Sequence, residues 1–244
     1  MLKLTGLCAL SLVFTWLHGG AVQAAFVSGD IIHIGDLAGI PGGVFHVTEP
    51  GDPETSFYTF CAHVGEDLNF DTPYMAVVSD HTDPDNKPVG PLAAWLYTQF
   101  LDQSPLLTNF DYSLITASDD NDIARRQAQA LQLGIWIGMG FPEDRIIDES
   151  AWAGWTEGLV AELKSAYLNQ WLTNFAQSGW GQTGFTGQIK ILNLYGMNMS
   201  GEYTRNVQDL LYRVPEPTTA LLLVGSAVAG LALVGRRRRL KQAA

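Results

Sequence analysis

An uninterrupted apolar stretch near the C-terminus limits what this chain can fold into more than any other feature. Residues 220–235 carry no charged side chain. Counted from Thr218, the stretch has about 18 residues, or roughly 27 Å as an α-helix, which is close to the hydrocarbon thickness of a bilayer. A basic cluster follows directly, consisting of Arg236, Arg237, Arg238 and Arg239. Because arginines stay on the cytoplasmic side, the sequence predicts a transmembrane helix that places the rest of the chain outside.

The N-terminus predicts a secretory signal. Lys3 precedes a mostly apolar run over residues 7–17, and mostly small residues occupy positions 19–25. A basic start, an apolar run and a small-residue cleavage site are the parts of a signal peptide. The run is shorter than the roughly 20 residues that a spanning helix needs. We therefore expect residues 1–24 to be removed on export.

The region between these ends, residues 25–213, has the length of one domain and is strongly acidic. It holds 8 Lys and Arg and 24 Asp and Glu, because six basic residues but only one acidic residue lie in the two ends. A formal charge near −16 argues against binding nucleic acid or anionic lipid. Two runs of aspartates, at residues 80–85 and 119–122, lack the Gly and distal Glu of a calcium loop. We expect solvated loops there, with no metal and no cofactor.

The order of predicted elements is strands, then helices, then strands. Short apolar or alternating runs that are typical of β-strands lie at residues 31–34, 43–47, 57–64, 74–78, 187–194 and 208–213. Helical spacing of apolar residues covers residues 91–100, 124–137 and 152–175. The Asp and Asn cluster at residues 119–122 is placed to cap the second helix. This order predicts an α+β fold, a β-sandwich or barrel-like sheet with a helical insertion.

Cys61 is the only cysteine that remains after the signal, because Cys8 is removed with it. No disulfide can then form within one mature chain. A single cysteine in an oxidising compartment is buried and inert, paired with another molecule, or committed to other chemistry. Cys61 is therefore the most informative residue of the domain.

Two short segments resemble a known kind of reactive site. Residues 57–61 read Phe-Tyr-Thr-Phe-Cys, and residues 131–136 read Leu-Gln-Leu-Gly-Ile-Trp. Together they resemble bacterial thioester domains, in which the cysteine sulfur condenses with a glutamine side chain and ammonia is lost. The resemblance implies a bond between Cys61 and Gln132. The residues that would support it are Phe60, Leu131, Ile135 and Trp136.

The chemistry of such a bond explains the residue types. A thiol attacks a side-chain amide only where the two groups are held together and water is excluded, which apolar neighbours and a tryptophan provide. The product is an acyl group that can be transferred to an amine or a hydroxyl. The resemblance thus implies a single-use acyl donor and not an enzyme with turnover.

The tail carries a second resemblance. Val214, Pro215, Glu216 and Pro217 precede the apolar stretch and the arginines. Residues 214–241 resemble a PEP-CTERM sorting signal, which an exosortase reads in Gram-negative bacteria that also make extracellular polysaccharide. Residues 93–100, 130–136 and 191–195 are similar to the body of thioester-like proteins that carry this tail. The resemblance implies a precursor tethered at the inner membrane, then processed to a cell-surface or extracellular protein that attaches to polysaccharide or surface protein.

Two other functions stay open. Cys61 alone is typical of a small buried hydrophobe, which would leave a non-catalytic structural or carbohydrate-binding matrix protein. Tryptophans at positions 152, 155, 171 and 180 would give such a protein a sugar-stacking surface, although large aromatic residues at helical spacing more often form core. A cysteine hydrolase would use His63 as its base, and the sequence assigns no Asn or Asp to orient it.

Overall fold

The structure of the protein is a computed structural model. It describes residues 27–36, 43–50, 52–65, 68–70, 72–83, 85–115, 121–150, 153–183, 186–198 and 200–215. The predicted signal peptide, the predicted transmembrane helix and the four arginines lie outside these residues. Within the described ranges, no helix has the length and apolar character needed to cross a membrane.

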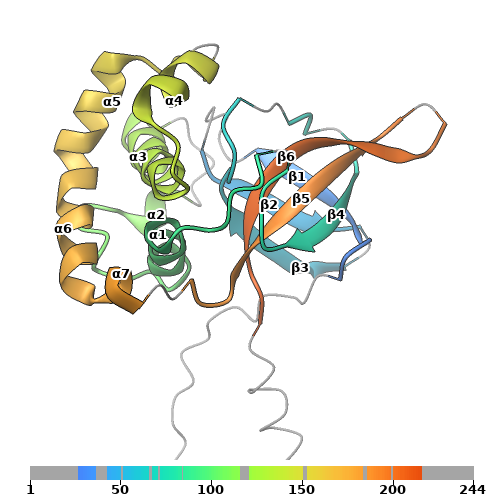
Figure 1. Cartoon of the computed structure of the whole chain (residues 1–244), viewed down its shortest axis with the longest axis horizontal. Helices are drawn as coiled ribbons and strands as arrows, with labels where there is room; N and C mark the ends of the chain where they lie inside the picture. Colours follow the sequence, from blue (N-terminus) through green and yellow to red (C-terminus); the bar gives the residue numbers. More distant parts are fainter. Residues whose placement is uncertain are drawn as a thin grey trace, which may run out of the picture.

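A β-sheet and a group of helices lie side by side (Figure 1). The strands are β1 (Ile31–Asp36), β2 (Phe45–Glu49), β3 (Asp52–Thr59), β4 (Tyr74–Ser79), β5 (Ile189–Met197) and β6 (Tyr203–Arg213). The helices are α1 (Pro91–Leu101), α2 (Tyr112–Ile115), α3 (Asp122–Gly138), α4 (Glu143–Glu149), α5 (Glu157–Leu163), the π-helix η2 (Lys164–Leu168), α6 (Asn169–Ser178) and α7 (Trp180–Thr183). All of these helices fall between β4 and β5, which confirms the α+β fold with a helical insertion.

The six strands form one antiparallel sheet in the order β3-β2-β1-β4-β5-β6. Alternate side chains point into the core, as Phe45 and Val47 do on β2. On β5, by contrast, four consecutive residues, 191–194, are buried. This burial fits a strand that has β4 and β6 on either side and the helical layer nearby.

The two ends of the sheet meet through the residues that follow β3. Cys61 forms an antiparallel bridge with Leu210 of β6. The backbone N–H of Leu211 donates to the carbonyl of Phe60 at 3.1 Å, and the hydroxyl of Thr59 donates to the carbonyl of Leu211 at 2.6 Å. The sheet therefore closes into a barrel-like form over residues 60–62 and 209–211, which pairs the backbone there with β6.

Glycines bring helices α1 and α3 into close contact. A side-chain carbon added to Gly138, the last residue of α3, would approach the backbone nitrogen of Ala93 on α1 to 2.4 Å. One added to Gly134 would approach a methyl carbon of Leu96 to 2.8 Å. The start of α3 is fixed by Asn121, whose side chain accepts a hydrogen bond from the backbone N–H of Ile123 at 2.8 Å. This cap confirms the start predicted for the second helix.

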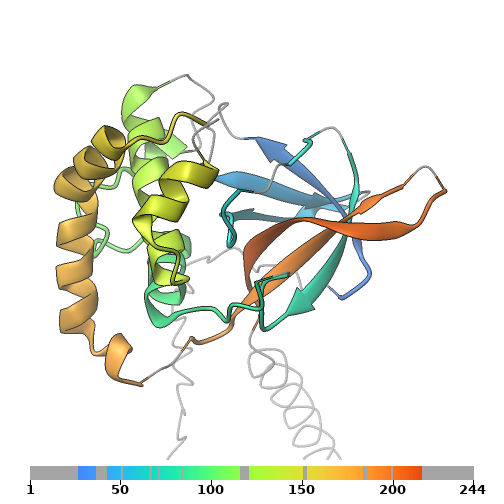
Figure 2. The same cartoon turned by 45° about the horizontal axis from the view of Figure 1, so that its top comes forward.

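Helices α5, η2 and α6 run in succession along the side of the helical layer that faces away from the sheet (Figures 1 and 2). The sequence predicted one helix over residues 152–175, and the structure corrects this. The helix begins at Glu157, because the Thr156 side chain caps it by accepting from the N–H of Leu159 at 3.2 Å. Five residues in its middle adopt the wider π-helical form.

Candidate functional site

Cys61 lies at the seam where the barrel closes. Its backbone faces β6 on one side, where the N–H of Ala62 donates to the carbonyl of Asp209 at 2.7 Å. The bridge to Leu210 is of the type in which neighbouring residues make the ladder hydrogen bonds, so the N–H and carbonyl of Cys61 itself point away from β6. Only 6 % of Cys61 is exposed. The cysteine is therefore held in a buried, regular backbone geometry.

The side chain of Gln132 binds both backbone groups that Cys61 turns away from the seam. The N–H of Cys61 donates to Gln132 Oε1 at 2.9 Å, and Gln132 Nε2 donates to the Cys61 carbonyl at 2.8 Å. Gln132 is fully buried. Its carboxamide takes the place of a neighbouring strand, and we name this pair of bonds the Gln132 clamp. The two residues that the sequence singled out are thus in direct contact.

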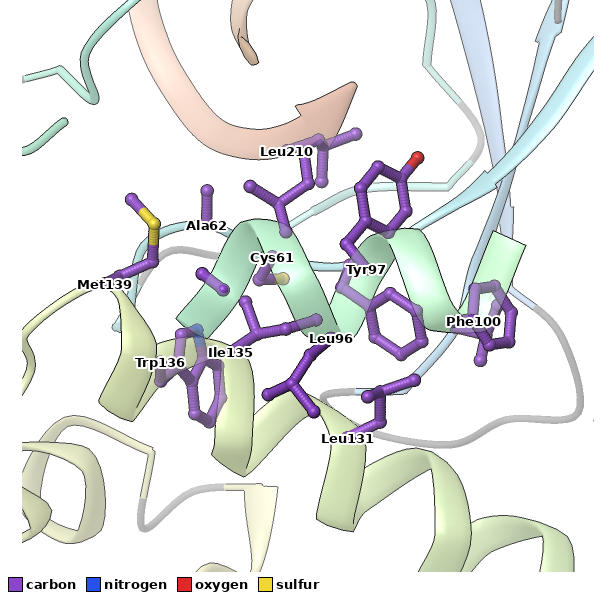
Figure 3. Close-up of a cluster of buried hydrophobic side chains, with 14 of the residues drawn as sticks. Cys61, Ala62, Leu96, Tyr97, Phe100, Leu131, Ile135, Trp136, Met139 and Leu210 are labelled. Carbon is purple, nitrogen blue, oxygen red and sulfur yellow. The ribbon is translucent and has the colours of Figure 1, made fainter. Parts of the chain in front are cut away.

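Apolar side chains enclose this contact. Figure 3 shows Cys61 among side chains from α1, α3 and β6, including Leu96, Tyr97 and Leu210. The four residues predicted to support the site are all buried, with at most 3 % of any of them exposed: Phe60, Leu131, Ile135 and Trp136. The site therefore excludes bulk water.

Two of these supporting residues have identifiable contacts. Phe60 packs edge to face against Tyr97 and Phe100, with ring centroids 6.4 Å and 5.0 Å apart. The indole nitrogen of Trp136 donates to the backbone carbonyl of His63 at 3.2 Å. That carbonyl also accepts from Gln208 Nε2 at 3.2 Å. Side chains from α3 and β6 thus hold the segment that follows Cys61 as well.

An ionic network that the sequence did not predict lies beside this segment. His63 Nε2 lies 3.1 Å from a carboxylate oxygen of Asp85, which Arg145 of α4 binds at 2.6 Å. Arg145 also binds Glu149 at 2.8 Å. Partial burial opposes ionisation of Asp85, but the hydrogen bonds from Arg145 and His63 outweigh it and lower the pKa of that carboxyl. His63 therefore has the acidic partner that the sequence left unassigned.

The sequence also did not predict a buried carboxyl on the β6 side of the seam, that of Asp209. Asp209 is fully buried on β6 and accepts hydrogen bonds from the N–H of Asp83 at 2.7 Å and from the Asn206 side chain at 3.0 Å. Burial raises the pKa of Asp209 to about 6, although these hydrogen bonds favour its ionised form. Only the register of β6 reveals that this aspartate points inward.

A second glutamine of α3 makes the same kind of contact as Gln132. Gln127 accepts from the N–H of Asp111 at 3.0 Å and donates to the carbonyl of Asn109 at 2.7 Å. These bonds hold the loop before α2 against α3. The sequence does not single out Gln127, because a glutamine that binds the backbone of a loop has no local sequence signal.

The other predicted sites have mixed outcomes. Trp155 and Trp171 are almost fully buried and Trp180 is partly buried, so the tryptophans form core instead of a sugar-stacking surface; residue 152 lies outside the described residues. In the first aspartate run, Asp80 pairs with Lys190 and Asp83 accepts from the Tyr195 hydroxyl. Within the described part of the chain, no group of three or more His, Cys, Asp or Glu is arranged to hold a metal ion.

The sorting motif begins where the folded domain ends. The N–H of Val214 donates to the carbonyl of Gln188 at 2.8 Å, and Arg213 pairs with Asp102 of the α1 end at 2.7 Å. Pro215 is the last described residue. Glu216, Pro217 and the basic cluster lie outside the described residues. The domain therefore stays folded up to the first residues of the motif.

Comparison with known proteins bears on this tail alone. A family described as the PEP-CTERM protein-sorting motif matches residues 213–239. No curated protein and no solved structure matches the chain. The match agrees with the predicted sorting signal to within two residues at each end. The chain carries a PEP-CTERM sorting motif, which indicates an exported protein with a membrane-anchored precursor that an exosortase processes.

Proposed function

We propose that this exported protein attaches covalently to a surface or an extracellular polymer through a thioester between Cys61 and Gln132. The observation that carries the proposal is the Gln132 clamp, whose two hydrogen bonds of 2.9 Å and 2.8 Å place the carboxamide against the backbone of the only mature cysteine. The target would be an amine or a hydroxyl on a polysaccharide or on another protein.

The reaction needs no cofactor. The sulfur of Cys61 attacks the carboxamide carbon of Gln132, the new bond joins sulfur to that carbon, and the bond from carbon to Nε2 breaks. The thiol proton leaves with the nitrogen, so that the products are a thioester and ammonia. An amine or hydroxyl later attacks the same carbon, which forms an amide or ester and returns the thiol. One molecule of protein acts once.

The surroundings favour each step. The N–H of Cys61 points at Oε1, where negative charge develops when the carbon is attacked, so it acts as a preorganised donor. The apolar side chains around the pair keep water from hydrolysing the thioester. After ammonia leaves, the carbonyl of Cys61 has lost its donor and can accept a hydrogen bond from an incoming amine.

A second candidate is a non-catalytic matrix protein in which the Gln132 clamp is purely structural. The observation in its favour is Gln127, which makes an equivalent pair of hydrogen bonds to residues 109 and 111 where no cysteine is present. Hydrogen bonding to backbone groups is therefore a sufficient role for a buried glutamine on α3. In this case Cys61 packs as a small apolar residue.

Intact-mass measurement of the exported protein separates the two candidates. The thioester predicts a wild-type mass that lacks one ammonia, and full masses for Cys61→Ala and Gln132→Ala. Gln127→Ala is the matched control and keeps the deficit, because its clamp has no thiol. Added methylamine should then attach to wild type and to Gln127→Ala only. A wild-type protein of full mass would leave the structural role as the conclusion.

A further inference from the structure

A cavity lies on the helical layer and takes no part in the Cys61 site. It has a volume of about 520 Å³ and is formed between α4 and the helical succession of α5, η2 and the start of α6. This volume falls in the range of small-molecule sites in proteins. Arg145 and Glu149 on α4 belong to the network beside His63, whereas Glu143, Asp144 and Ile147 line the cavity.

The π-helix forms one wall of this cavity. The N–H of Asn169 reaches back five residues to the carbonyl of Lys164, which is the π-helical pattern. Lys164 and Ser165 of η2 both line the cavity, together with Asn169. Short π-helical turns are rare and are found frequently at functional sites, because they are retained against a better helical alternative. The irregular turn thus lies in the wall of the cavity.

The lining combines apolar side chains with uncharged polar groups of two kinds. Ile147, Val160 and Ala161 supply the apolar part. Ser165 and Asn169 supply an uncharged hydroxyl and an uncharged amide. A ligand that matches both has an apolar face and several hydroxyl groups, which is the character of a pyranose ring.

The charges of the lining favour a cation. Glu143 is paired with Lys164 at 2.6 Å. Asp144 and Glu157 also line the cavity, and neither forms an ion pair within the described part of the chain. Two carboxylates thus line the cavity without an ion-pair partner, while Arg145 of α4 is engaged with Asp85 and Glu149. A protonated amine would supply the missing positive charge.

We propose that this cavity binds an amino-sugar unit of a polysaccharide, with its ammonium group between Asp144 and Glu157 and its ring over Ile147 and Ala161. A lysine side chain would match the carboxylates and the apolar side chains but would leave Ser165 and Asn169 without partners. An anionic sugar would meet the two carboxylates and be repelled. This binding is non-covalent and does not depend on the thioester.

The test is a binding titration of the exported protein with chitosan oligosaccharide at a pH where its amines are protonated and the carboxylates are ionised. Chitin oligosaccharide of the same length is the neutral probe, and oligolysine of the same charge is the peptide probe. We expect chitosan to bind and the other two to bind roughly tenfold more weakly or not at all. The double variant Asp144→Asn with Glu157→Gln should weaken chitosan binding roughly tenfold.

A matched control lies outside the cavity. Asp148→Asn with Glu202→Gln removes the same charge from two exposed positions that do not line the cavity. This control should bind chitosan as wild type does. Equal loss in both double variants would mean general attraction to an acidic protein, and would overturn the site. Equal binding of oligolysine, or no binding of chitosan, would overturn it as well. Repeating the titration with Cys61→Ala should leave the affinity unchanged, which keeps this test separate from the thioester.

Discussion

Gln132 holds Cys61 from the side opposite to β6, with its amide oxygen on the N–H of Cys61 and its amide nitrogen on the carbonyl of the same residue. The cysteine backbone therefore lies between a strand and a helix side chain, and both of its polar groups are satisfied without a second strand. Gln132 therefore contributes to the stability of the fold through these two hydrogen bonds.

Gln132→Ala should lower the free energy of unfolding by roughly 2–6 kcal/mol, because it leaves two buried backbone groups without partners at about 1–3 kcal/mol each. The loss is measured by urea unfolding. Gln127→Ala should have a smaller effect, because Asp111 and Asn109 lie at a more exposed loop where water can replace the side chain. Wild-type stability of Gln132→Ala would contradict the structural importance of the clamp.

Cys61→Ala tests for the thioester through the free energy of unfolding, because a cross-link restricts the unfolded chain. A thioester would join residues that are 71 positions apart. By the chain-entropy argument used for disulfides, such a cross-link adds roughly 4 kcal/mol to the free energy of unfolding. If the thioester is present, Cys61→Ala should cost at least that much; if it is absent, the loss of one small buried side chain should cost about 1 kcal/mol. The measurement is denaturant unfolding of freshly purified protein, with methylamine-treated wild type as the uncross-linked control.

Gly138→Ala should loosen the contact between α1 and α3 that places Gln132. The added carbon would lie 2.4 Å from the backbone nitrogen of Ala93, so α3 must shift, at a cost of roughly 1–3 kcal/mol. Gly158→Ala is the control, because the nearest atom to its added carbon is the Thr156 hydroxyl at 3.9 Å. Thermal melting should fall for the first variant and stay equal or rise for the second.

Asp209 predicts a dependence of stability on pH. Its pKa is raised to about 6 in the folded state from an ordinary value of 3.8, so the folded protein binds this proton more tightly than the unfolded chain. The protonated carboxyl of Asp209 therefore adds on the order of 3 kcal/mol to the free energy of unfolding. This stabilisation is fully present below about pH 4 and is lost as pH rises through about 6. Urea unfolding of wild type should therefore give a lower free energy of unfolding at pH 8 than at pH 5. Asp209→Asn should remove this difference.

Asp85 provides the opposite control for that experiment. Its pKa is lowered in the folded state, since the hydrogen bonds from Arg145 and His63 outweigh partial burial. The stabilisation of the fold by the ionised Asp85 carboxylate is present above its ordinary pKa and is lost as pH falls through the lowered value. Asp85→Asn should therefore lower the free energy of unfolding at pH 8.

The outcome that would contradict the Asp209 prediction is a pH profile of stability that Asp209→Asn leaves unchanged. The change between pH 4 and pH 7 could then not be assigned to the Asp209 carboxyl.

The sorting motif predicts where the mature protein ends. In a host that has an exosortase, the last residue of the exported form should lie near Pro215, Glu216 or Pro217, just after the last hydrogen bond of the folded domain at Val214. Mass spectrometry of peptides from the exported material checks this end. Peptides that contain Arg236 to Arg239 in that material would contradict processing.

Much of the fold was predictable because it depends on local patterns. Strand residues such as Phe45 and Val47 alternate with polar neighbours, and the apolar positions of α3 recur at helical spacing after the Asn121 cap. The barrel closure was only partly predictable. The sequence placed one strand across residues 57–64, but β3 ends at Thr59 because Cys61 pairs with a side chain on one face and with β6 on the other.

The sequence by itself revealed the sorting motif and singled out Cys61 and Gln132 as a candidate pair, because a motif, a basic cluster and a short segment around a cysteine are properties of residue type and order. Only the tertiary structure decided that Gln132 meets Cys61, that Asp85 pairs with His63 and that Asp209 is buried. These contacts join positions far apart in the chain, and they depend on how closely α1 and α3 pack and on the register of β6. Packing and register are collective results of the whole core, so no local pattern contains them.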